Sequence, residues 1–147
     1  MAKRSVDRFR DAALASEIEF LLARARAVGI IHANEAFVAL GLKARSYSVL
    51  SLAASGLNPT QRELADFLSL DASQIVAIVD ELEQAGFVVR QPAPNDRRTN
   101  VIVATDSGLA KHREAQAAAE KAEGESMNAL SASEQDALRE LLTKIAF

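Results

Sequence analysis

The sequence predicts a mainly α-helical fold that carries one small β-hairpin, and three observations point to it. Apolar residues recur at intervals of three and four along most of the chain, which is the period of an amphipathic helix. Capping boxes or related start signals, which mark the beginning of a helix, occur at Thr60, Asp71 and Ser131. Two β-branched runs, 87–89 and 101–103, flank a polar tip that contains prolines. Strands are therefore expected only in this last region.

The composition limits the class of protein. The chain has 147 residues and 49% of them are hydrophobic, enough for one domain with a core, or for a small domain with helical extensions. Cysteine is absent, which excludes disulfides, thiolate metal sites and cysteine nucleophiles. Neither a membrane-spanning apolar run nor a leader peptide is recognised, so we expect a cytoplasmic protein with no membrane partner.

The first long helix is expected to begin near Asp11 and to reach Ala33 or beyond, and Gly29 marks a point where it could break. A shorter helix is expected from Ala44 to Ala54. The preceding segment, 1–10, is rich in lysine and arginine, and it is either a solvated terminus or a basic arm on DNA.

The centre of the chain predicts a winged helix-turn-helix. The helices that begin at Thr60 and Asp71 are joined by only a few residues, so they must cross steeply. The second helix ends at Gly86, a residue suited to the left-handed C-cap, and the hairpin follows as the wing. We expect an N-terminal dimerisation helix in 1–40, the winged lobe in 41–104 and C-terminal dimerisation helices in 105–147.

The long flanking helices predict a homodimer. Their apolar stripes have no large domain of their own to pack on, and a symmetric pair of chains would bury them. The alternative is a monomeric helical cap over the winged lobe. The expected interface residues are Leu14, Ile18, Leu21, Leu138, Leu141, Leu142 and Ile145.

A specific spacing connects the recognition helix to the wing and to the next helix. It reads Leu82-Glu83-x-x-Gly86-Phe87-Val88, then seven residues, then Asp96-Arg97-Arg98, then six residues, then Thr105-x-x-Gly108. This pattern resembles the multiple-antibiotic-resistance regulator (MarR) family of bacterial transcription factors. The resemblance implies an obligate dimer on a pseudo-palindromic operator and, in many members, a repressor released by a small aromatic or phenolic ligand.

Two groups of candidate DNA contacts lie on the helix-turn-helix. The N-terminus of its first helix offers amides and one cation to a phosphate. The N-terminus of the second helix would face base edges in the major groove. For Gln74, pairing with adenine and capping of its own helix are equally reasonable. The candidates are Thr60, Gln61 and Arg62 on the first helix, and Ala72, Ser73, Gln74, Val76 and Ala77 on the second.

The wing supplies the third group. The resemblance assigns Arg98 to the minor groove of A·T-rich DNA, with Arg97 on a phosphate and Asp96 fixing Arg98 through a charge-assisted pair. The alternative is a solvated turn with a weak surface ion pair.

The charge of the winged lobe departs from that of a typical DNA-binding domain. The net charge is −3, and the stretch from Asp71 to Val89 contains no cation. We therefore expect an A·T-rich site read through methyl contacts and shape, with a shallow dependence on salt. The alternative function is a protein-interaction module that has lost specific DNA binding.

The sequence gives only weak signals for a ligand pocket, a metal site or a catalytic site. A ligand pocket is expected where the first helix, the Tyr47 helix and the start of the Thr105 helix meet, lined by Phe37, Tyr47 and Leu50, unless these are ordinary core. His32 and Glu35 could share a metal, but they are more simply a surface pair. No catalytic triad or phosphate loop is found, so we expect no enzyme activity, no cofactor and no metal.

Overall fold

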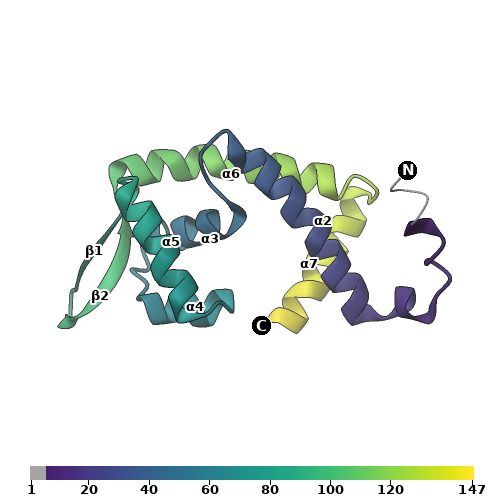
Figure 1. Ribbon diagram of the computed structural model, residues 1–147, viewed down its shortest axis with the longest axis horizontal. Coiled ribbons are helices and arrows are strands. Elements are labelled where there is room, and N and C mark those ends of the chain that lie inside the picture. Colours follow the sequence, from purple (N-terminus) through teal and green to yellow (C-terminus); the bar gives the residue numbers. More distant parts are fainter. Residues whose placement is uncertain (1–5) are drawn as a thin grey trace. The chain divides into compact units, whose positions relative to one another are not determined.

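The computed structural model describes residues 6–147, which form helices and one two-stranded antiparallel sheet (Figure 1). Lys3 and Arg4 of the predicted basic segment lie outside the described residues. The mainly α fold with one hairpin is thereby confirmed. The elements are η1 (Ala13–Ser16), α2 (Ile18–Val38), α3 (Ala44–Ala53), α4 (Gln61–Leu68), α5 (Ala72–Gln84), β1 (Val88–Ala93), β2 (Asp96–Ala104), α6 (Asp106–Ser126) and α7 (Ala132–Ala146).

The chain divides into two compact units. One contains the described residues up to His32 together with 123–147, and the other contains 33–122. Helices α2 and α6 each contribute residues to both units. No helix in the described part of the chain is both long and apolar enough to cross a membrane.

The second unit is built around the helix-turn-helix. Helices α4 and α5 are joined through Ser69, which adopts a left-handed conformation with φ 52° and ψ 47°. The N–H of Leu70 donates to the carbonyl oxygen of Ala65 at 3.0 Å and closes the turn. The core of this unit consists of fully buried side chains from every one of its elements, including Phe37, Leu50, Leu64, Ile75, Val79, Val88 and Ile102.

The hairpin is attached to the start of α4. Its strands pair in register from Val88 opposite Ala104 to Pro92 opposite Asn100, followed by an irregularity before the tip. The N–H of Ile102 donates to the carbonyl oxygen of Pro59 at 2.8 Å, beside the residue that caps α4. This contact holds the wing against the helix-turn-helix.

Hydrogen bonds and close packing attach the start of α6 to the end of α5. Gly86 has φ 77° and ends α5 as the sequence predicts. The Thr105 hydroxyl donates to the Gly86 carbonyl oxygen at 2.6 Å and accepts from the Gly108 N–H at 3.0 Å. A Cβ on Gly108 would lie only 1.8 Å from the Phe87 carbonyl oxygen, so this position requires glycine. The hydrogen bonds of Thr105 and the close approach of Gly108 to Phe87 thus explain the Thr105-x-x-Gly108 spacing.

The predicted beginning of the first helix is wrong. Residues Ala13–Ser16 form a separate 3₁₀ turn, Glu17 is extended with ψ 131°, and α2 begins at Ile18. The Ser16 hydroxyl donates to the Ala13 carbonyl oxygen at 2.8 Å, a local bond that competes with helix continuation. Gly29, in contrast, does not interrupt α2, which continues to Val38.

Helix α7 begins at the capping box predicted at Ser131. The Ser131 N–H donates to Glu134 at 2.8 Å, and the Glu134 N–H donates to the Ser131 hydroxyl at 3.3 Å. Within the first unit, Arg139 of α7 pairs with Glu123 of α6 at 3.2 Å. The Arg139–Glu123 pair connects α7 to the last turns of α6.

Candidate nucleic-acid interface

The N-terminus of α4 carries a complete capping box. The Thr60 N–H and hydroxyl both donate to Glu63 Oε2 at 2.8 Å, and the Glu63 N–H donates to Thr60 Oγ1 at 3.2 Å. The backbone bond from Thr60, and then its side-chain bond, lower the pKa of Glu63. Because Glu63 occupies the Thr60 amide, the first-turn donors left for a phosphate are the amides of Gln61 and Arg62.

The N-terminal part of α5 presents small and apolar side chains to solvent. Ala72, Ser73 and Ala77 are exposed, and Val76 is 40% exposed. Gln74 is half-buried, and its Oε1 accepts the Asp71 N–H at 3.2 Å. The capping alternative for Gln74 is therefore the arrangement that the structure adopts, and any adenine contact would have to replace it.

Arg90, on β1, compensates the acidic part of α5. Its guanidinium pairs with Asp80 at 2.5 Å and with Glu83, and its Nε donates to Gln61 Oε1 at 2.9 Å. Burial lowers the pKa of Arg90, the Asp80 and Glu83 hydrogen bonds raise it, and the net change is upward, so the cation is permanent. Sequence reasoning overlooked this residue, because its partners Asp80, Glu83 and Gln61 lie on other elements and meet it only in the folded chain.

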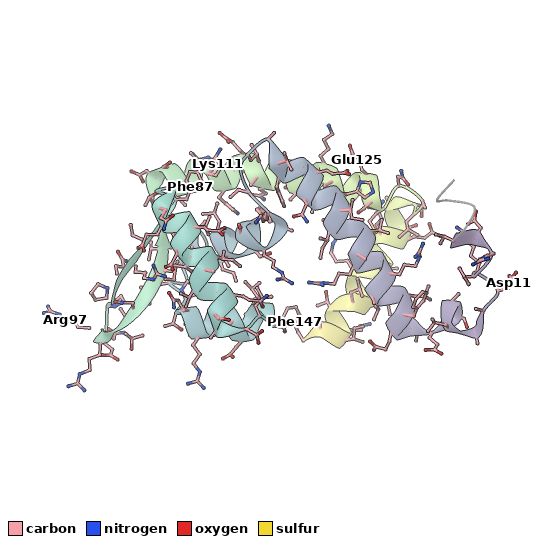
Figure 2. The ribbon with its side chains drawn as sticks, viewed as in Figure 1. Asp11, Phe87, Arg97, Lys111, Glu125 and Phe147 are labelled. Carbon is pink, nitrogen blue, oxygen red and sulfur yellow. The ribbon has the colours of Figure 1, made fainter. Side chains whose placement is uncertain are left out.

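The wing tip is a tight turn with exposed arginines. Asp96 accepts the Arg98 N–H through Oδ1 at 2.9 Å and the Thr99 hydroxyl through Oδ2 at 2.9 Å. These two bonds, the backbone bond first, lower the pKa of Asp96. Figure 2 shows Arg97 at the tip of the hairpin, pointing away from α4 and α5.

The predicted charge-assisted pair of Asp96 is made with the backbone of Arg98. None of the ion pairs formed within residues 6–147 joins Asp96 to the guanidinium of either wing arginine. Asp96 therefore fixes the turn from which Arg97 and Arg98 project, and both side chains are exposed.

An aromatic stack lies inside the second unit. The rings of Phe37 and Tyr47 are 4.9 Å apart, and His112 of α6 stacks on Tyr47 at 6.1 Å. His112 Nε2 lies 3.1 Å from the Ser51 hydroxyl. Phe37 and Leu50 are 1% and 0% exposed, so both are core residues here, while Tyr47 and His112 are half-buried. The ligand role of Phe37, Tyr47 and Leu50 stays a prediction, and His112 is a neighbour that sequence reasoning did not assign.

Among residues 6–147, no group of three or more His, Asp or Glu side chains could hold a metal ion. His32 and Glu35 thus have no third carboxylate or imidazole ligand in this part of the chain.

Comparison with known proteins decides the family. The MarR family model matches residues 42–99. The crystal structure of a MarR-family transcriptional regulator from Rhodococcus sp. RHA1 is 39% identical, with a TM-score of 0.87, over 93% of this chain and 97% of that chain. The chain belongs to the MarR family. It is accordingly a DNA-binding transcriptional regulator on a winged helix-turn-helix scaffold.

Other solved structures are similar over most of the chain. CouR from Rhodococcus jostii RHA1, bound to p-coumaroyl-CoA, is 38% identical over 93% of this chain and 96% of that chain, with a TM-score of 0.82. The Mycobacterium tuberculosis MarR-family protein Rv2887, in complex with salicylic acid, is 25% identical over 88% of this chain and 96% of that chain, with a TM-score of 0.75.

A curated relative matches over a shorter stretch. An uncharacterised HTH-type regulator of Bacillus subtilis, YcgE, is 35% identical over 48% of this chain. The matched region spans 56% of that protein's own length. These relatives are transcriptional regulators and not enzymes.

Proposed function

We propose that this MarR-family regulator is a cytoplasmic homodimer that binds a pseudo-palindromic operator as a repressor and leaves it when a small aromatic ligand binds. The observation that carries the proposal is the wing, where Asp96 holds the turn and leaves Arg97 and Arg98 exposed. Arg98 would enter an A·T-rich minor groove and Arg97 would contact a phosphate.

The helix-turn-helix would supply the remaining contacts. Gln61 and Arg62 would bind a phosphate at the N-terminus of α4, where free amides meet the positive end of the helix dipole. Ser73, Val76 and the alanines of α5 would approach base edges in the major groove, with Val76 and the alanines suited to thymine methyl groups. Gln74 would join them only after its capping bond is released.

The apolar surface of the first unit supports dimerisation. Ile18, Leu141 and Ile145 are 73%, 60% and 68% exposed in the single chain, and Leu14 and Leu21 are about half exposed. A groove of about 540 Å³ near the N-terminus is lined mostly by apolar side chains, among them Leu14 and Leu21. A second chain that covers this surface would remove it from water. We assign dimerisation to 1–40 and 105–147 and DNA binding to 41–104.

Two relatives support an aromatic ligand. CouR binds p-coumaroyl-CoA and Rv2887 binds salicylic acid, and both ligands contain a phenolic ring. In this chain, the half-buried Tyr47 belongs to an aromatic stack with Phe37 and His112. We place the ligand against Tyr47, with Leu50 behind it.

The test is a footprint of the purified protein on the DNA upstream of its own gene at low salt, repeated with p-coumaroyl-CoA, with salicylate and with coenzyme A alone. The proposal predicts two protected half-sites about one helical turn apart. It also predicts loss of protection with an aromatic compound but not with coenzyme A. If no sequence is specifically protected, the protein-interaction alternative replaces the proposal. If protection persists with every aromatic compound tested, ligand release is rejected while DNA binding stands.

A further inference from the structure

The exposed part of α5 poses an electrostatic problem for DNA binding. Asp80, Glu81 and Glu83 lie on the helix expected in the major groove, and α5 itself contains no cation. Phosphates flank both sides of that groove, and like charges at such distances repel each other. A helix with this composition needs a compensating charge from elsewhere.

Arg90 supplies that charge from a neighbouring element. Its Nη1 pairs with Glu83 and its Nη2 with Asp80 at 2.5 Å, while its backbone N–H donates to the other Glu83 oxygen at 3.0 Å. Its Nε donates to Gln61 at 2.9 Å. One side chain of β1 thereby contacts both α5 and the first turn of α4.

The Arg90 side chain is mostly buried, whereas the wing residues Arg97 and Arg98 are exposed. Only 23% of the side chain is exposed, against 50% for Asp80 and 39% for Glu83. Three of the five guanidinium N–H donors are already engaged, and the side chain is mostly buried, so Arg90 is less available to a phosphate than the wing arginines are. Its effect on DNA would therefore act through the carboxylates that it pairs.

We propose that Arg90 is a positioning residue for operator binding, because it neutralises Asp80 and Glu83 and so permits an otherwise acidic recognition helix to approach DNA phosphates. The inference rests on the proposed operator binding. Neutralisation of Asp80 and Glu83 by Arg90 would make the acidic composition of α5 compatible with operator binding. Glu81, which has no such pair with Arg90, remains a source of weak repulsion.

The experiment compares Arg90→Met with the triple variant Arg90→Met, Asp80→Asn, Glu83→Gln. Methionine keeps an apolar stem and removes the charge, and the two amides then remove the carboxylates left unpaired. Operator affinity is measured by fluorescence anisotropy at several salt concentrations, with thermal unfolding followed by circular dichroism. Arg139→Met is the control for loss of a paired arginine outside the DNA-binding lobe, since Arg139 also pairs with two carboxylates, Glu123 and Asp136. Sedimentation checks that this variant still assembles as the wild type does.

We expect Arg90→Met to weaken operator binding by about tenfold or more at low salt, with a smaller loss at high salt, where screening shortens the reach of the exposed carboxylates. The triple variant should return to within about threefold of the wild type, and Arg139→Met should bind as the wild type does. A triple variant as weak as Arg90→Met would overturn the proposal, because it would show that Arg90 acts on DNA itself or only as a scaffold.

If Arg90→Met does not fold, Arg90→Lys takes its place. Lysine keeps the positive charge, so near-normal affinity is expected, and a tenfold loss in a folded lysine variant contradicts charge compensation. Operator binding by the wild-type protein shows whether the proposed function or only the role of Arg90 has failed. If the wild type binds no operator, the proposed function fails and this inference with it; if the wild type and Arg90→Met bind equally, only the inference fails.

Discussion

The contact between Gly108 and Phe87 gives the sharpest stability prediction. Gly108→Ala would place a Cβ 1.8 Å from the Phe87 carbonyl oxygen and 2.8 Å from its carbonyl carbon, both of which are backbone atoms. That oxygen already accepts the Thr105 N–H at 3.0 Å. A side chain could move aside, but here α6 or the chain after Gly86 must shift.

The expected loss follows from these contacts. Overpacking of a well-packed position costs roughly 1–3 kcal/mol, and weakening of the Thr105 bond adds about 1 kcal/mol. Gly108→Ala should therefore lower the free energy of unfolding by about 2–4 kcal/mol, less a helix-propensity gain of at most about 1 kcal/mol. For a chain of this size that corresponds to a fall in Tm of roughly 4–16 °C.

Thermal and urea unfolding, followed by circular dichroism, measure the change. Gly124→Ala is the matched control, because Gly124 lies in the same helix and has nothing within 4 Å of its would-be Cβ. That control should be neutral or more stable, by up to about 1 kcal/mol of helix propensity. If Gly108→Ala is as stable as Gly124→Ala, the close approach of α6 to Phe87 is refuted.

Three further predictions concern pH, assembly and salt. The pKa of Glu63 is lowered from its ordinary value of 4.5, so its contribution to stability is present above that value and is lost as pH falls through the lower folded pKa. Glu63→Gln should therefore lose less stability than the wild type on acidification, and an equally steep loss in urea unfolding would argue against the capping bond. Leu141→Asp with Ile145→Asp should weaken dimerisation by at least about 100-fold in sedimentation, by loss of apolar burial on both chains. Leu57→Asp, on the turn before α4, should leave it unchanged, and a stable dimer of the double variant would contradict the assigned interface. The dependence of operator affinity on salt should match only a few phosphates per lobe, and a slope typical of a strongly basic protein would contradict the assignment of few cationic contacts.

The parts of the fold that sequence predicted are those fixed by local chemistry. The capping boxes at Thr60 and Ser131 place both bonding partners three residues apart, and Gly86 ends α5 through its own backbone conformation. Such features depend on neighbouring residues alone. The same holds for the period that marks the long helices, although it did not reveal the extended residue Glu17 that separates η1 from α2.

The site depended more on distant contacts, and there sequence reasoning fell short. Arg90 is separated from Gln61 by 29 residues and meets it only when the wing folds against α4. The acidic side chains of α5 were visible in the sequence, but their ion pairs with Arg90 were not. At the wing tip, the family resemblance paired Asp96 with Arg98, yet Asp96 accepts the Arg98 backbone amide and the Thr99 hydroxyl, which a side-chain pattern does not specify.

The most direct test of the account is the effect of Arg98→Ala on the operator, measured by anisotropy and by hydroxyl-radical footprinting, with sedimentation as the check on assembly. We predict a sharp loss of affinity, loss of minor-groove protection at the flanks of each half-site, and an unchanged dimer. Unchanged affinity with an unchanged footprint in a dimeric Arg98→Ala variant would contradict the claim that the wing carries recognition.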